Sequence, residues 1–253
     1  MFKIALTAGH YKYTSGKRCL KSLDPTETRE WTLNDRIADK IEQKLSAYDG
    51  YSLLRTDDTT GETAISVEDR VSAANRFGAD VYISIHHNAG IGGGTGGGIM
   101  AYTYTKVGEA AKQWQKELYD ALIYHTGLKG NRATPLATAN FAECRDTAMP
   151  AVLLELGFMD SAVDVPMILS DTFAESAANA IVEVLVRKGG LTQKPAPQPE
   201  PEPTPEPTPE PTPEPTPDDA ENLIKENANI IVRFLKFVAT LLAKIFGKGK
   251  ADV

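Results

Sequence analysis

The chain has 253 residues, of which 42% are hydrophobic and 24% charged, and its formal net charge is -7 at pH 7. This length suits one sizeable domain with appendages, and the acidic balance excludes nucleic acid as the main partner. The two cysteines, Cys19 and Cys144, are too few for a disulfide framework, so we expect free thiols.

Residues 1–190 alternate between short apolar runs and amphipathic segments. Apolar residues spaced by three or four positions predict helices, and short apolar runs predict strands. The expected strands are 2–6, 51–54, 81–85, 99–104 and 151–154, and the expected helices are 30–47, 67–77, 109–125 and 173–186. This order predicts an α/β fold, with one domain built on a mostly parallel or mixed sheet flanked by helices.

Two of the four histidines follow expected strands. His10 comes after the first strand, and His86 ends the third and is followed by His87. Functional groups gather at the carboxyl ends of parallel strands, and a catalytic zinc takes three histidine or carboxylate ligands. Glu27 and Glu30 are the carboxylate candidates between the histidines, and spacing does not choose between them.

A third candidate is Glu155, which ends the apolar run 150–154 and precedes Leu156. A carboxyl at the end of a buried strand is partly desolvated, which raises its pKa toward values useful for proton transfer. We therefore expect Glu155 to act in catalysis rather than as a structural acid. By contrast, His125 near a helix end is expected to be structural, and the glycine-rich residues 92–98 are expected to form a flexible cleft loop.

The composition changes sharply after the first domain. Residues 191–219 repeat Pro-Glu-Pro-Thr, which predicts an extended linker that buries no core. Residues 220–250 then have an apolar face with a narrow polar stripe that includes Arg233, Lys236 and Lys244, which predicts an amphipathic helix.

The order of several motifs in residues 2–188 is similar to that of the zinc-dependent N-acetylmuramoyl-L-alanine amidases, the amidase-3 family shared by wall-remodelling enzymes and phage endolysins. The stretches that carry the resemblance are 6–10, 30–34 with 37–38, 54–56, 69–70 with 74–75, 79–80, 84–89 and 150–158.

The resemblance implies a catalytic Zn²⁺ held by His10, Glu30 and His86. In this family the ligand glutamate precedes an asparagine by four residues, which selects Glu30, and the second histidine directly follows Ser-Ile, which selects His86. Glu155 would assist catalysis, and the role of His87 stays open. The family commonly has glycine after the first histidine, whereas this chain has Tyr11, so we expect a differently shaped cleft mouth.

The implied function is peptidoglycan hydrolysis at the amide bond between N-acetylmuramic acid and L-alanine. The apolar run around Ile4 is too short for a signal peptide. We therefore expect a phage-type lysin that is made in the cytoplasm and acts on the cell wall after release. The alternatives are a bacterial wall-remodelling amidase and a non-catalytic wall-binding module.

The C-terminal helix has three interpretations. It could lie on a membrane surface, associate with other copies into a homo-oligomer, or span a membrane. Charged residues inside its apolar run, Arg233 among them, count against the third. The first two stay open.

Overall fold

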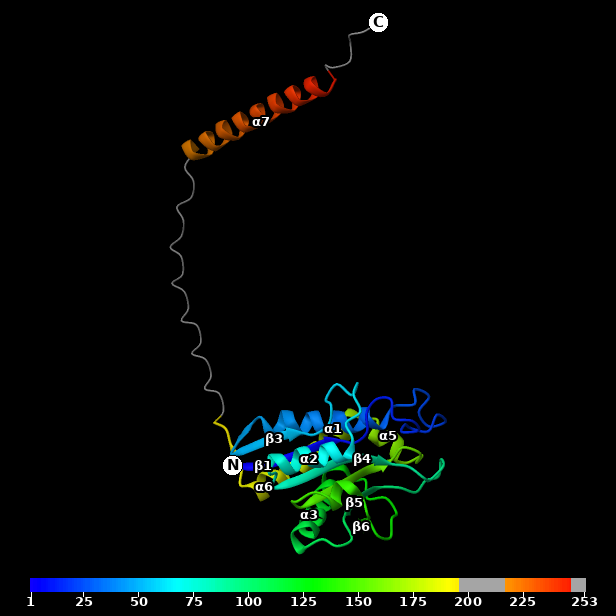
Figure 1. Cartoon of the computed structure of the whole chain (residues 1–253). Coiled ribbons are helices and arrows are strands. Elements are labelled where there is room, and N and C mark those ends of the chain that lie inside the picture. The colour runs from blue at the N-terminus through cyan, green and yellow to red at the C-terminus, as the bar shows by residue number, and fades with distance from the viewer. Residues whose placement is uncertain (196–216, 247–253) are drawn as a thin grey trace. The chain divides into compact units, whose positions relative to one another are not determined.

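The computed structural model describes residues 1–195 and 217–246 (Figure 1). The chain divides into two units, Met1–Ala196 and Pro197–Val253, and each is described by itself. Most of the linker predicted at 191–219 lies outside the described residues, as do residues 247–250 of the predicted C-terminal helix.

The first unit is built on a six-stranded mixed sheet in the order β3-β1-β4-β7-β5-β6. Strands β3, β1, β4 and β7 are parallel, and β5 is antiparallel to β7 but parallel to β6. The strands are β1 (Phe2–Ala8), β2 (Tyr48–Asp49), β3 (Tyr51–Arg55), β4 (Val81–Asn88), β5 (Ile99–Thr103), β6 (Leu136–Thr138), β7 (Ala151–Phe158) and β8 (Thr192–Gln193). The predicted α/β fold with a mixed sheet is confirmed.

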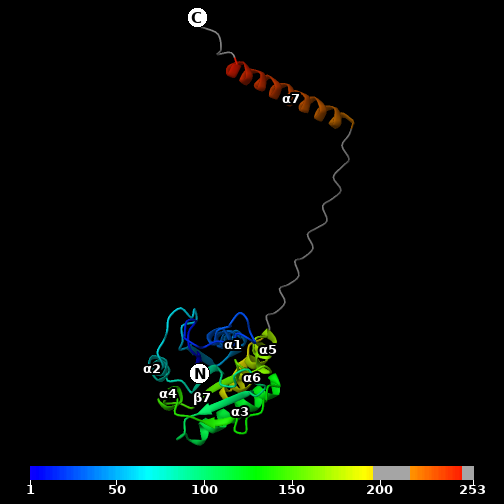
Figure 2. The same ribbon diagram turned by 90° about the vertical axis from the view of Figure 1, so that its right-hand side faces the viewer.

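Helices cover both faces of this sheet, with α2 and α4 on one side and α6 on the other (Figure 2). The helices are α1 (Glu30–Leu45), α2 (Val67–Phe77), α3 (Glu109–Thr126), α4 (Ala142–Arg145), α5 (Asp164–Ile168), α6 (Asp171–Gly189) and α7 (Pro217–Phe246). Four of them match the helices predicted for residues 1–190. The short helices α4 and α5 and the strands β2, β6 and β8 were not predicted.

The two faces differ in how much apolar surface they bury. Side chains alternate between the faces of a strand, so Ile83 and Ile85 of β4 point into a large core shared with α1, α3 and α6. Tyr82 points the other way, into a small core that includes Ala74 of α2 and Cys144 of α4. The small face therefore leaves room beside the sheet for polar side chains.

The chain after α6 stays attached to this unit. Thr192 and Gln193 of β8 pair with β2, and Lys194 N–H donates to the Ala47 carbonyl at 2.8 Å. The packed part of the chain therefore extends a few residues past position 190.

The second unit contains α7, a helix of 30 residues. Its apolar side chains between Leu223 and Leu242 are mostly exposed, and Lys225 pairs with Glu221 one turn away at 2.9 Å. Among residues 1–195 and 217–246, no helix combines the length and apolar character needed to cross a membrane.

Candidate metal centre

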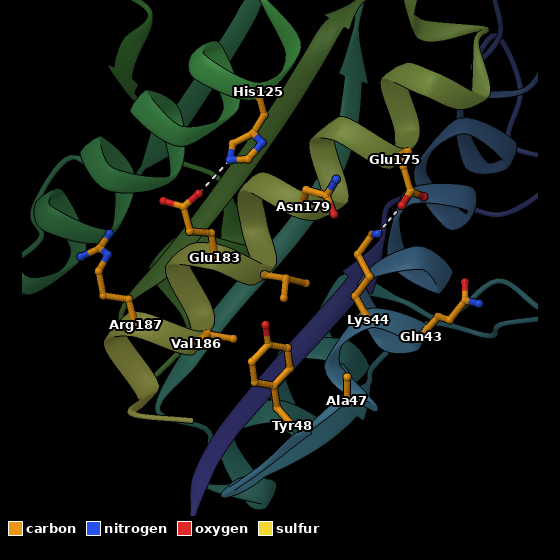
Figure 3. Close-up of a pocket in the computed structure, with 11 residues that line it drawn as sticks. Gln43, Lys44, Ala47, Tyr48, His125, Glu175, Asn179, Glu183, Val186 and Arg187 are labelled. Carbon is orange, nitrogen blue, oxygen red and sulfur yellow. Dashed lines mark hydrogen bonds and ion pairs between the residues drawn. The ribbon is translucent and has the colours of Figure 1, made fainter. Parts of the chain in front are cut away.

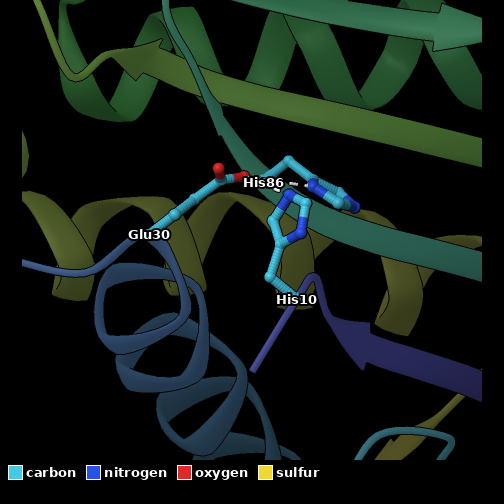
Figure 4. Close-up of side chains that lie close together, drawn as sticks. All are labelled: His10, Glu30 and His86. Atoms are coloured by element: carbon cyan, nitrogen blue, oxygen red, sulfur yellow. Dashed lines mark hydrogen bonds and ion pairs between the residues drawn. The ribbon is translucent and has the colours of Figure 1, made fainter. Parts of the chain in front are cut away.

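Three residues predicted as metal ligands lie together at the carboxyl end of the parallel strands (Figure 4). His10 follows β1, Glu30 is the first residue of α1, and His86 lies in β4. Glu30 Oε1 is 3.3 Å from His10 Nε2 and 3.2 Å from His86 Nδ1. Each residue offers a ligand atom within 4.8 Å of the others, so this cluster is able to hold a metal ion.

His10 is held by its backbone. Its φ of 67° is in the left-handed region, which is uncommon for a residue other than glycine. The buried guanidinium of Arg70 in α2 donates hydrogen bonds to the carbonyls of His10, at 2.7 Å, and Ala8, at 3.0 Å, and to the hydroxyl of Thr7, at 3.0 Å. Arg70 thus fixes the turn that presents the imidazole of His10 to Glu30.

Gly9 makes room for His86. A Cβ atom at position 9 would lie 2.1 Å from Cε1 of the His86 ring. Gly9 N–H also donates to the Ile85 carbonyl at 2.8 Å, which continues the pairing of the two chain segments. The glycine is required because the imidazole occupies the space of its side chain.

His87 points to the opposite face of β4 and is buried. Its Nδ1 is 2.8 Å from Asn34 Oδ1, and Asn34 Nδ2 donates to the Gly9 carbonyl at 3.1 Å. Burial lowers the pKa of His87 to about 3, so the ring is neutral. These contacts give His87 a structural place behind the candidate ligands and explain why an asparagine lies one helical turn after Glu30.

The carboxylate of Glu30 is the electrostatic centre of the cluster. Burial opposes its charge, but hydrogen bonds from His10 and His86 hold its pKa well below the ordinary value. Within the described residues its Oε2 atom has no hydrogen-bond partner, although the ammonium of Lys17 lies 3.5 Å away. Glu30 is therefore ionised, and one of its oxygen atoms accepts no hydrogen bond within the described residues and faces a cationic side chain.

Glu155 lies inside β7, where it pairs in register with His86 of β4. Both residues line a cavity of about 340 Å³, together with Lys17, Phe141 and other residues. Glu155 Oε2 is buried and has no hydrogen-bond partner within the described residues. Burial raises the pKa of Glu155 to about 7, and this outweighs the opposing charge of His86. A carboxyl in this state can accept and release a proton near neutral pH.

A second acid in the cavity was missed by the sequence reasoning. Glu143 of α4 is 5% exposed and its Oε2 lies 3.4 Å from His86 Nε2. Burial opposes its charge, but the contact with His86 lowers the pKa of Glu143. No pattern in the sequence indicated this residue, because it belongs to a four-residue helix between two loops. Arg145, which follows it closely, instead pairs with Asp146.

Other sequence candidates lie apart from the cluster. Glu27 accepts an ion pair from Arg18 at 2.8 Å. Cys19 and Cys144 are buried free thiols, and burial raises the pKa of each to about 12. Asp160 Oδ2 accepts backbone N–H groups from Gly90, Ile91 and Gly92, which anchors the start of the glycine-rich loop.

A larger groove, of about 880 Å³, lies on the other side of the sheet between α1 and α6 (Figure 3). His125 Nε2 is 2.7 Å from Glu183 there, and the ammonium of Lys44 pairs with Glu175. The predicted structural role of His125 agrees with this pairing. The groove holds none of the candidate ligands.

Comparison with known proteins shows which family the chain belongs to. Residues 4–187 match the family described as N-acetylmuramoyl-L-alanine amidase. The N-acetylmuramoyl-L-alanine amidase CwlM of Bacillus licheniformis is 32% identical over 196 residues, which is 78% of this chain and 72% of that protein. The sporulation-specific N-acetylmuramoyl-L-alanine amidase of Bacillus subtilis is 36% identical over 153 residues, covering 59% of this chain and 56% of that protein.

A phage protein and two solved structures are also similar. The endolysin of Bacillus phage SPP1 is 34% identical over 121 residues, 46% of this chain and 44% of that protein. The N-acetylmuramoyl-L-alanine amidase from Clostridium difficile 630 superposes with a TM-score of 0.66 at 26% identity, covering 74% of this chain and 95% of that one. The catalytic domain of CwlV from Bacillus (Paenibacillus) polymyxa var. colistinus gives 0.65 at 25%, covering 74% and 98%.

Proposed function

We propose, from the premise that this chain belongs to the N-acetylmuramoyl-L-alanine amidase family, that it hydrolyses the amide bond between N-acetylmuramic acid and L-alanine in peptidoglycan. The observation that carries the proposal is the cluster of His10, Glu30 and His86 beside the buried carboxyl of Glu155. His10 and His86 of the cluster line the same cavity as Glu155, so a bound amide could reach both the cluster and the acid.

We propose that His10, Glu30 and His86 hold a zinc ion. Two histidines and one glutamate are a donor set of catalytic zinc sites, which keep a further position open for water or substrate. The fit is supported by the buried atom Glu30 Oε2, which accepts no hydrogen bond within the described residues and lies 3.5 Å from the ammonium of Lys17, and by two imidazoles directed at one carboxylate. When bound, zinc would polarise the scissile carbonyl and lower the pKa of a water molecule.

The proton transfers are assigned to Glu155. It takes a proton from the attacking water as the water oxygen bonds to the carbonyl carbon. It then gives that proton to the alanine nitrogen as the carbon–nitrogen bond breaks, so the same carboxyl serves first as base and then as acid. Its pKa near 7 suits both steps, because a group that titrates near the working pH can accept and donate.

The test is fragment analysis on purified peptidoglycan by mass spectrometry. Cleavage at the proposed bond releases stem peptides that begin with a free L-alanine amine and leaves glycan strands that keep the lactyl carboxyl. Activity should be lost after treatment with a chelator and return on addition of Zn²⁺. New reducing sugar ends, or cuts within the stem peptide, would contradict the proposed bond. Binding to the wall without release of fragments would indicate a wall-binding module instead.

We propose that the biological role is lysis of a host cell by a phage-type enzyme. The similarity to the endolysin of phage SPP1 supports this role, while the similarity to two bacterial amidases, CwlM and the sporulation-specific amidase of Bacillus subtilis, supports a role in the bacterium's own wall. Expression in a bacterium with the matching wall separates the two. A lysin should leave growing cells intact until the membrane is permeabilised and then clear the culture within minutes. A remodelling enzyme should alter separation or shape of growing cells without lysis.

We also propose that α7 is an interaction element. Its wide apolar face with Arg233 and Lys236 on the polar side supports two partners, a second copy of the chain or an anionic membrane surface. Sedimentation of the full chain alone and with anionic vesicles decides between them. Ile231→Glu, on the apolar face, should abolish whichever association occurs, and Asn229→Gln, on the polar stripe, should leave it intact. A full chain that stays monomeric and does not bind vesicles would contradict both.

A further inference from the structure

Glu143 is a buried acid whose carboxylate meets three side chains of one strand. Side chains two residues apart share a face of β4, and Tyr82, Ser84 and His86 all point toward α4. Tyr82 donates its hydroxyl to Glu143 Oε1 at 3.2 Å, and Ser84 donates its hydroxyl to Oε2 at 3.2 Å. His86 Nε2 lies 3.4 Å from Oε2.

Each of the two nitrogens of the His86 ring lies close to a carboxylate. Nδ1 faces Glu30 Oε1 in the candidate metal centre, and Nε2 faces Glu143. Within residues 1–195 and 217–246, Nε2 is buried and makes no hydrogen bond, and Glu143 Oε2 is a carboxylate oxygen 3.4 Å away from it. A neutral imidazole carries one N–H, an ionised carboxylate only accepts, and a metal ion binds the ring nitrogen that lacks the proton. A metal ion held at Glu30 would therefore replace the proton of Nδ1, and the acid beside Nε2 would keep the one remaining N–H on that nitrogen.

The ring has little freedom to choose another orientation. Its face lies against Gly9, where a Cβ atom would come within 2.1 Å of Cε1. The carboxylate of Glu143 is itself fixed by the two hydroxyls from Tyr82 and Ser84. A carboxylate held at both oxygens does not follow a ring that tilts away, so the position of Nε2 is set by the strand and α4 together.

We propose that Glu143 is a positioning residue for the metal centre, accepting the Nε2–H of His86 and so directing Nδ1 toward the metal. This role rests on the proposed zinc site. A buried carboxylate without such a task is costly, because it must be compensated by hydrogen bonds that an apolar residue would not require. Carboxylate partners of metal-bound histidines typically affect metal affinity by about 10-fold to 100-fold.

The experiment measures the dissociation constant for Zn²⁺ by competition with a chromophoric chelator. Glu143→Gln keeps the shape but is a weaker acceptor, and we expect zinc binding about tenfold weaker than wild type. Glu143→Leu removes the acceptor, and we expect a loss nearer 100-fold. As a matched control, Cys144→Ala trims a buried side chain of the same helix but leaves the carboxylate of Glu143 in place, and should change affinity less than threefold.

A second readout separates positioning from general destabilisation. Nuclear magnetic resonance of the imidazole nitrogens in the zinc-loaded protein should show Nε2 of His86 protonated and Nδ1 without a proton in the wild type. In the variants the Nε2–H signal should shift or exchange faster with water, while the signals of His87 stay unchanged.

The outcomes are distinguishable. Failure of the wild type to bind Zn²⁺ would overturn the proposed function itself. Wild-type binding together with a folded Glu143→Leu variant that binds within threefold of it would overturn the role of Glu143 alone. Should that variant not fold, the same threefold criterion applies to Glu143→Gln. Equal losses in Cys144→Ala and Glu143→Gln would reduce Glu143 to a structural contact between β4 and α4.

Discussion

Two cavities of the amidase unit, on opposite sides of the sheet, differ in chemistry. The groove between α1 and α6 is larger, but its charged side chains pair with one another, as Lys44 does with Glu175. The smaller cavity beside α4 contains Glu155, whose buried Oε2 atom has no hydrogen-bond partner within the described residues. The larger volume favours the groove as the functional site, whereas the unsatisfied buried carboxyl favours the smaller cavity, and we expect the second criterion to hold because perturbed buried groups cluster at functional sites.

The contrast arises because exposed ion pairs and buried carboxyls differ in their free-energy cost. An exposed ion pair is nearly neutral in free energy, so it can occur wherever opposite charges meet on neighbouring helices. A buried carboxyl without a partner costs stability and persists where it has a task. The following predictions test whether this contrast separates a functional face from a structural one.

The largest effect is expected for the acid in the small cavity. Glu155→Gln removes the group that takes and returns the proton, so kcat/KM on peptidoglycan should fall about 10²-fold to 10⁴-fold. Glu183→Gln in the groove is the matched control and should keep activity within twofold. Release of stem peptides measures both. A Glu155→Gln enzyme that retains a tenth of the activity would remove this residue from the proposed mechanism.

The groove face should instead respond in stability. Ile181 of α6 is fully buried against the sheet, and Ile181→Ala should lower the free energy of unfolding by about 2–5 kcal/mol. Urea unfolding followed by circular dichroism measures the loss. The folded fraction should keep the wild-type kcat, because Ile181 belongs to the large core and does not line the small cavity. A tenfold fall in kcat under folding conditions would show that the two faces are coupled.

Metal binding should stabilise the chain only through the small cavity. Zn²⁺ at about 100 times its dissociation constant adds about 2.7 kcal/mol, which corresponds to a rise in Tm of roughly 5–10 °C for a unit of this size. Thermal scans of chelator-treated protein with and without Zn²⁺ measure the rise. His10→Ala should abolish it and His125→Ala should preserve it. The reverse pattern would place the metal in the groove.

The smallest effect belongs to the exposed pair in the groove. A double-mutant cycle with Lys44→Ala and Glu175→Gln should give a coupling energy of about 0.2–1 kcal/mol at low salt. The coupling should shrink in 1 M NaCl, because salt screens exposed charges. A coupling above 2 kcal/mol that persists in salt would mean that the groove is more specialised than a packed helical surface.

The regular elements were predictable where they are long. The 67–77 helix was predicted from the spacing of its apolar residues with the bounds that α2 has. In the structure Ser66 caps its start and Gly78 ends it in a left-handed conformation. β6 and α4 were missed, since three or four residues carry too little periodicity to be recognised. The antiparallel pairing of β5 with β7 was not predictable from its apolar run, because an apolar strand can pair in either direction.

The site was predictable in its ligand types and less so in its surroundings. The sequence identified His10 and His86 because each ends or follows an apolar run, and the family resemblance selected Glu30 over Glu27. The structure brings His10, Glu30 and His86 together. It also adds Glu143, which belongs to a short helix that the sequence did not predict. Gly9 was read as part of a motif, whereas its contact with the His86 ring explains why no larger residue fits.

By itself the sequence determined the layered α/β fold, the two candidate histidine ligands and the acidic residue Glu155, since local spacing and residue chemistry encode these features, and the family resemblance added Glu30. The tertiary structure decided which face of the sheet carries the candidate site, how the two nitrogens of His86 are divided between Glu30 and Glu143, and which buried carboxyl oxygens of the described residues lack a hydrogen-bond partner. These depend on contacts between residues distant in the chain, which no local pattern records.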